Sequence, residues 1–111
     1  MTQKPVIWVG SSRRNAIELP AEARHQLGRD LYQVQLGKSP SSWRPISSVG
    51  AGVIELRVSV KGEFRLMYVA KFAEGIYVLH VFQKKRRKTL PLDIEVTRVR
   101  FRMACRMHEE R

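Results

Sequence analysis

The chain has 111 residues, of which 43% are apolar and 28% charged, a balance typical of an ordered globular protein and not of a disordered chain. Its single cysteine, Cys105, excludes an intrachain disulfide, and the apolar helical pattern around it favours a buried small side chain over a nucleophile. The formal net charge of +11 predicts an affinity for polyanions.

At this length we expect one domain over residues 1–111. The N-terminal segment has too few consecutive apolar residues for a secretory signal. No run of roughly eighteen apolar residues is present to form a membrane span. We therefore expect a cytoplasmic protein that does not bind membranes.

Residues 6–9 are β-formers and predict a first strand, either buried on both faces or placed at a sheet edge. Two helices should follow. Ser11 or Ser12 can cap the first helix, and Pro20 both interrupts it and can start the second. The second helix should end at Gly37. Its expected apolar face consists of Ala23, Leu27, Leu31 and Val34.

Residues 38–52 are rich in Ser, Pro and Gly and predict a long loop, pinned by Trp43 and Ile46. Three strands with short turns should follow as an antiparallel meander. Their expected ranges are 53–61, 64–72 and 76–83.

The turn at Lys61-Gly62 decides which side chains share a face of this meander. A two-residue loop would place Arg57 on the face of Leu66. A loop one residue longer would place Arg57 beside Arg65 and leave the apolar side chains of both strands on the other face. We favour the longer loop or a bulge, because it buries the apolar set together.

A final helix should begin after Pro91. Its expected apolar stripe consists of Val96, Val99, Met103 and Met107. The resulting order, β-α-α-β-β-β-α, defines an α+β fold whose antiparallel-rich sheet is covered on one face by the N-terminal helix pair. We expect the other face to be open.

The positive charge is concentrated at the C-terminal end, with +6 on residues 83–111 against +4 on residues 1–50 and +1 on residues 51–82. A localised basic patch of this kind indicates nucleic-acid binding, with a merely solvated basic helix as the alternative. Metal and nucleotide chemistry find little support. The three histidines, at 25, 80 and 108, lack zinc spacing, the carboxylates are scattered, and no phosphate-loop or nucleophile-elbow motif occurs.

Cationic and aromatic residues gather on and just beyond the predicted sheet. They are Arg57, Arg65, Tyr68, His80, Phe82, Lys84 and Lys85. This composition suits RNA, because cations stabilise the charge that develops on a phosphate under attack and aromatic rings hold unstacked bases. The alternatives are structural: the two aromatic residues in the core, the arginines solvated, and His80 a structural histidine.

Three sequence blocks resemble the HigB-like, phage-derived branch of the RelE toxin superfamily. They are Val53-Ile54-Glu55-Leu56-Arg57, Gly62-Glu63-Phe64-Arg65-Leu66-Met67-Tyr68, and Val78-Leu79-His80-Val81-Phe82-Gln83-Lys84-Lys85, followed by Lys88-Thr89-Leu90-Pro91. The resemblance runs from about Ile7 to Met107. It implies a RelE-like fold and ribosome-dependent cleavage of mRNA in the A site without a metal or other cofactor. It also implies neutralisation by a cognate antitoxin, often a helix-turn-helix protein.

By position, the resemblance makes Arg65, Lys84 and Lys85 the catalytic cations, supported by Arg57. The expected substrate-binding residues are Tyr68, Phe82, His80, Arg86, Arg87 and Lys88. The general base is left unassigned. Two alternatives stay open at this point: a nucleic-acid-binding module without catalysis, and a degenerate toxin kept as an interaction partner.

Overall fold

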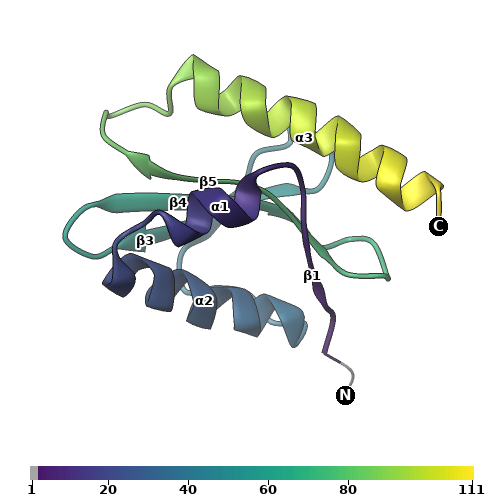
Figure 1. The fold of residues 1–111 in the computed structure, drawn as a ribbon, viewed down its shortest axis with the longest axis horizontal. Coiled ribbons are helices and arrows are strands. Elements are labelled where there is room, and N and C mark those ends of the chain that lie inside the picture. The colour runs from purple at the N-terminus through teal and green to yellow at the C-terminus, as the bar shows by residue number, and fades with distance from the viewer. Residues whose placement is uncertain (1–2) are drawn as a thin grey trace.

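A five-stranded mixed sheet, with strand order β1-β5-β4-β3-β2, lies at the centre of the computed structural model (Figure 1). The structure describes residues 3–111, so the first two residues of the N-terminal segment lie outside it. The elements are β1 (Val6–Trp8), α1 (Ser12–Ile17), α2 (Ala21–Gln35), β2 (Trp43–Pro45), β3 (Val53–Ser59), β4 (Glu63–Val69), β5 (Ile76–Lys84) and α3 (Pro91–Glu109).

The predicted α+β class is confirmed, with one strand more than expected. Residues 38–52 are not a continuous loop, because β2 pairs antiparallel with β3 and forms one edge of the sheet. The segment is also fixed by a hydrogen bond from the Ile46 amide to the Val53 carbonyl at 2.8 Å. At the opposite edge, β1 pairs in parallel with β5, so of the two positions left open for the first strand the structure has the sheet edge.

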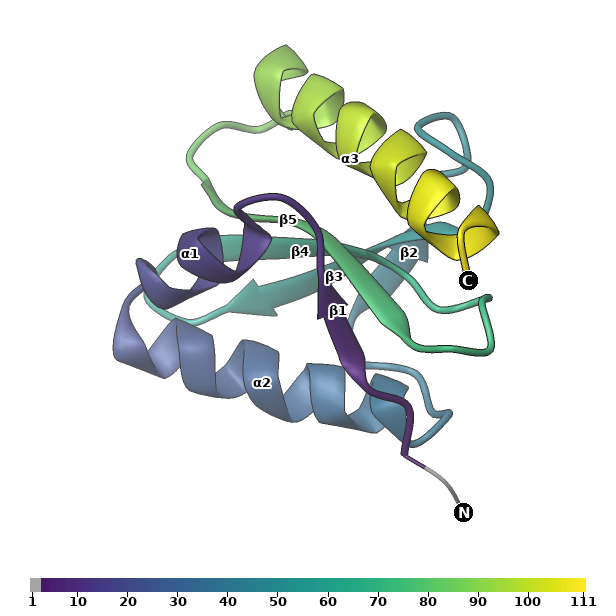
Figure 2. The same cartoon turned by 45° about the vertical axis from the view of Figure 1, so that its right-hand side comes forward.

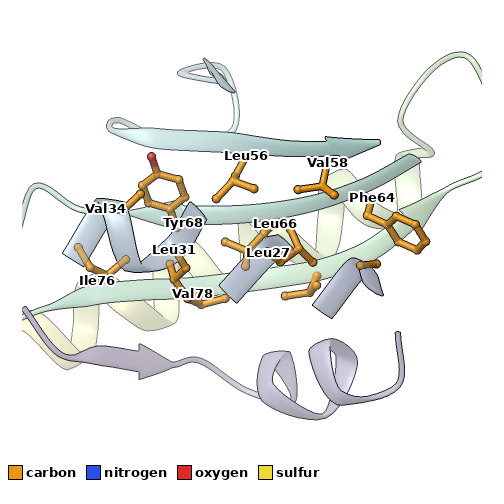
Figure 3. Packing of buried hydrophobic residues seen from close by; sticks show 12 residues of the cluster. Leu27, Leu31, Val34, Leu56, Val58, Phe64, Leu66, Tyr68, Ile76 and Val78 are labelled. Carbon is orange, nitrogen blue, oxygen red and sulfur yellow. The ribbon is translucent and has the colours of Figure 1, made fainter. Parts of the chain in front are cut away.

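The helix pair α1 and α2 covers one face of the sheet, as the apolar periodicity predicted (Figure 1). The α2 side chains Leu27, Leu31 and Val34 pack against alternate residues of β3, β4 and β5 (Figure 3). Ser11 stands at the N-cap of α1 without a side-chain cap bond, and the Ser12 hydroxyl instead accepts the Val9 amide at 3.1 Å.

The longer turn between β3 and β4 is confirmed. Ser59 pairs with Glu63, so residues 60–62 form the loop, and Lys61 adopts a left-handed φ of 53°. Arg57 therefore faces Arg65 across the strands. The apolar side chains that alternate with these arginines turn to the face that α1 and α2 cover.

The second face of the sheet is not open, because α3 packs diagonally across it (Figure 2). The predicted stripe of α3 is partly wrong: Val99 is 42% exposed, while Thr97 and Ala104 are fully buried. Phe101, Met103 and Met107 complete the contact. The predicted burial of Cys105 is met only in part, since the side chain is half-buried. No helix within residues 3–111 is long and apolar enough to cross a bilayer.

Candidate active site

Three side chains from three adjacent strands form a row on the face that α3 partly covers. Arg57 on β3 lies opposite Arg65 on β4, and Arg65 lies opposite Phe82 on β5. We call these three residues the cross-strand row. The antiparallel register aligns them, because directly opposed residues of neighbouring strands point to the same face.

Arg65 lies in the middle of the row and is buried, with only 6% of its side chain exposed. Its Nη1 donates to the Phe64 carbonyl at 3.0 Å and to Glu63 Oε1 at 3.3 Å. The predicted position of this side chain on an open face is therefore wrong.

Glu55 is the partner that holds the buried charge of Arg65. Its side chain is 1% exposed, and Oε1 accepts a hydrogen bond from Arg44 Nε at 2.9 Å and lies 3.8 Å from Arg65 Nε. A buried cation needs such a counter-charge, because desolvation of an isolated ion is costly. The sequence signal was present in strand alternation, which puts Glu55 on the same face as Arg57.

Unsatisfied polar atoms remain at this centre. Arg57 Nε, Arg65 Nε and Glu55 Oε2 are buried and have no hydrogen-bond partner among the described residues. Buried polar atoms are normally paired, and exceptions mark sites where a solvent molecule or a ligand completes the network. The cluster thus has donor capacity that the protein itself does not use.

Arg57 lies on the accessible side of the row. It is half-buried and forms no ion pair within residues 3–111. β2 pairs with β3 as far as Leu56, and the Arg57 amide donates to the Ser42 carbonyl at 2.9 Å, so the segment before β2 flanks this edge of the sheet. A groove of about 500 Å³ runs along it. The groove is lined by Gln26, Asp30, Ser41, Ser42, Arg57, Val58, Ser59, Val60, Glu63 and Arg65.

His80 supports the Phe82 end of the row. Its ring stacks on Phe82 with centroids 4.8 Å apart and an interplanar angle of 22°. His80 Nε2 lies 2.8 Å from Asp93 Oδ1 in the first turn of α3. Burial lowers the pKa of His80, and the hydrogen bond and charge of Asp93 oppose this shift. The role of Asp93 was not predictable from the sequence, since only the fold brings this residue to β5.

The basic run follows directly after the row. Lys84 is half-buried, and Lys85, Arg86, Arg87 and Lys88 are exposed. No member of the run forms an ion pair within the described part of the chain. Lys84 pairs in register with Glu63, next to the Arg65–Phe82 pair. The run thus extends the positive charge of the row along the end of β5.

Tyr68 does not join these residues. It lies on the face that α1 and α2 cover, is 4% exposed, and packs among the core side chains (Figure 3). Burial raises the pKa of Tyr68 to about 12. The predicted grouping of Tyr68 with the cationic residues is therefore wrong, because strand alternation places it with Phe64 and Leu66. Within residues 3–111, no three His, Cys, Asp or Glu side chains are grouped to bind a metal.

The β-α-α-β-β-β-β-α order and the mixed five-stranded sheet correspond to a RelE-like fold. A family model described as "Phage derived protein Gp49-like (DUF891)" matches residues 17–102. The chain belongs to this family, which is part of the RelE-like toxin-antitoxin group and is associated with RelE-type endoribonucleases. Membership implies an antitoxin as partner. A search of curated proteins gave no significant match.

Proposed function

We propose that the chain is the toxin of a type II toxin-antitoxin system of the HigB-like branch. It cleaves mRNA in the ribosomal A site, without a metal, and a helix-turn-helix antitoxin neutralises it. In this proposal one domain, in the cytoplasm, carries the whole activity.

One observation carries the proposal: Arg57, without a counter-ion in the described residues, lies beside the buried Arg65 at an open groove next to the basic run. Two adjacent guanidinium groups repel each other unless an anion lies nearby. Glu55 and Glu63, which both lie near Arg65, balance part of this charge. A phosphate in the groove supplies the remainder and pairs with guanidinium in a two-pronged geometry.

The proposed reaction is a transesterification within the RNA that consumes no co-reactant, since the proton lost by the 2′-oxygen balances the proton gained by the 5′-oxygen. The ribose 2′-oxygen loses its proton and attacks the adjacent phosphorus, and the bond to the 5′-oxygen breaks. The 5′-oxygen takes up a proton, and the upstream fragment keeps a 2′,3′-cyclic phosphate. Negative charge on the phosphorane rises during this step, so preorganised cations lower the barrier. Arg57, Lys84 and Lys85 supply the stabilising positive charge at the surface. Arg65 supplies it from its buried position in the sheet.

The remaining residues bind the substrate in this proposal. Phe82 and His80 are each only 8% exposed, so the stacked pair presents its outer rim, against which an unstacked base packs in this proposal. Arg86, Arg87 and Lys88 are exposed at the end of β5 and contact flanking phosphates.

Tightly controlled expression in a bacterium tests the proposal. A toxin arrests growth, leaves transcripts cut within reading frames, and is relieved by co-expression of the product of the neighbouring gene. A non-catalytic binding module or a degenerate toxin leaves transcripts intact. Uncut transcripts together with normal growth would refute the proposed function.

A further inference from the structure

The helices α1 and α2 lie on the side of the sheet away from α3 (Figures 1 and 2). An apolar groove lies between them. It encloses about 200 Å³ and is lined mainly by apolar side chains. The lining residues are Trp8, Arg13, Ala16, Ile17, Arg24, Leu27, Gly28, Leu31 and Leu66.

The groove opens to solvent and is not a packing defect of the core. Ile17 at its rim is 49% exposed although it is a large apolar residue. Gly28 is at a position where a Cβ would meet no atom within 4 Å. The helix thus leaves room for an external side chain beside Gly28. A second hollow continues along α1 and shares Arg13 and Ile17 with the groove.

Charge around the groove defines the chemistry of the occupant. Arg13 and Arg24 are the only charged residues among the described residues that line it, and Arg14 lines the adjoining hollow. None of the three forms an ion pair within residues 3–111. Arg24 donates only to the Ile17 carbonyl, at 3.4 Å. An apolar floor with a basic rim is complementary to an apolar side chain flanked by carboxylates.

We propose that this groove docks an acidic, amphipathic segment of the antitoxin, with an apolar side chain seated beside Gly28 and carboxylates paired with Arg13 and Arg24. The identity of the partner rests on the proposed function, while the surface and its chemistry rest on the groove. RNA is a poorer fit, because the floor offers no donor for phosphate. The Arg57 side chain also points to the other face of the sheet, because it alternates with Leu56 and Val58, which pack under α2.

The experiment measures binding of the purified product of the neighbouring gene to the full chain by titration calorimetry. Gly28→Leu fills the groove from within and should weaken binding by about tenfold or more, as loss of a central anchor does. Arg24→Glu should weaken binding more than Gly28→Leu does when the salt concentration is low. His25→Leu adds the same side chain to an exposed position of α2 outside the groove and should leave the affinity within about twofold.

Growth assays separate the failure of this inference from the failure of the proposed function. If Gly28→Leu still arrests growth but the neighbouring gene product no longer relieves the arrest, the docking surface is supported. Relief equal to that of the wild-type chain, or no complex with the wild-type chain, would overturn the docking surface. A change in the oligomeric state of Gly28→Leu, or loss of RNA cleavage, would assign the groove to a second copy or to RNA and would also overturn it. The proposed function fails separately, if the wild-type chain alone neither arrests growth nor cuts transcripts.

Discussion

Arg57 and Arg65 face each other across β3 and β4, yet only Arg65 has acidic partners: Glu63 at 3.3 Å and Glu55 at 3.8 Å. The two arginines therefore differ in what their substitution will do. Arg57 lies at the groove and carries a charge that the described part of the protein does not balance. Arg65 is part of a buried charge network that also supports the fold.

Arg57→Ala should lower RNA cleavage by about a hundredfold, the effect of removing one preorganised donor from a developing oxyanion. Its stability should change by only about 1 kcal/mol or less, because the side chain is half-buried and forms no ion pair in the described chain. Cleavage by the purified variant and its melting temperature are the measurements. Arg102→Ala, an exposed arginine on α3, is the matched control and should cleave like the wild-type chain. Equal cleavage by the Arg57 and Arg102 variants would remove Arg57 from the site.

Arg65→Ala should lower both cleavage and stability. Truncation leaves the buried Glu55 with Arg44 as its remaining cation and should cost about 2 kcal/mol of unfolding free energy, the scale for an unsatisfied buried polar group. Arg65→Lys keeps the charge and should recover most of this stability. Cleavage should recover only partly, since an ammonium lacks the two-pronged contact of guanidinium.

Denaturant unfolding alongside cleavage assays distinguishes these outcomes. A lysine variant that regains stability without full cleavage supports a role of the guanidinium in the reaction. Full cleavage by Arg65→Ala would contradict the assignment.

The sequence predicted which residues of this site face one another better than it predicted how far they are buried. Alternation in residues 53–61 and 64–68 favoured the longer turn at Lys61, and that register aligns Arg57 with Arg65. Burial of Arg65 was not predictable, because it depends on Glu55 and Glu63, from two different strands, lying close to its side chain. The same alternation assigned Tyr68 to the core side, although its aromatic ring suggested a base-binding role.

The strand β2 and the buried face of α3 were predicted wrongly, and both errors concern packing. β2 consists only of Trp-Arg-Pro. Proline is compatible with a strand at a sheet edge, and only the fold shows that this segment lies at one. In α3 the close contact with the sheet uses the small residues Thr97 and Ala104, which hydrophobic periodicity does not emphasise. The larger Val99 is left in solvent.

Stability should fall as the pH falls below about 6.5. The pKa of His80 in the folded chain is lowered by burial below its usual 6.5, so the unfolded chain takes up the proton first. Its contribution is therefore complete above the unfolded pKa and declines as the pH falls toward the folded pKa, at a rate of up to about 1.4 kcal/mol per pH unit.

His80→Gln keeps a donor for Asp93 but does not titrate, so its melting temperature should depend less on pH between about 7 and 5.5. His25→Gln, at an exposed position, is the control and should follow the wild-type profile. Identical pH profiles for the His80 variant and the wild-type chain would show that this histidine does not couple protonation to folding.

Binding of a single-stranded RNA oligonucleotide should weaken steeply with salt, with a log–log slope of about −0.7 for each phosphate neutralised. The double variant Lys84→Gln/Lys85→Gln should make the slope shallower by about 0.7 for each cation that contacts a phosphate. Fluorescence anisotropy over a salt series measures this. An unchanged slope in the double variant would exclude these lysines from the interface.

We propose that a ribosome-bound transcript is cut in the groove beside Arg57. The most direct test adds the purified chain to translating ribosomes and maps the new transcript ends together with their terminal chemistry. We expect cuts at the codon in the A site and upstream fragments that end in a 2′,3′-cyclic phosphate. These cuts should be lost with Arg57→Ala and persist with Arg102→Ala. Intact transcripts with the wild-type chain, or identical cuts with both variants, would contradict the proposal.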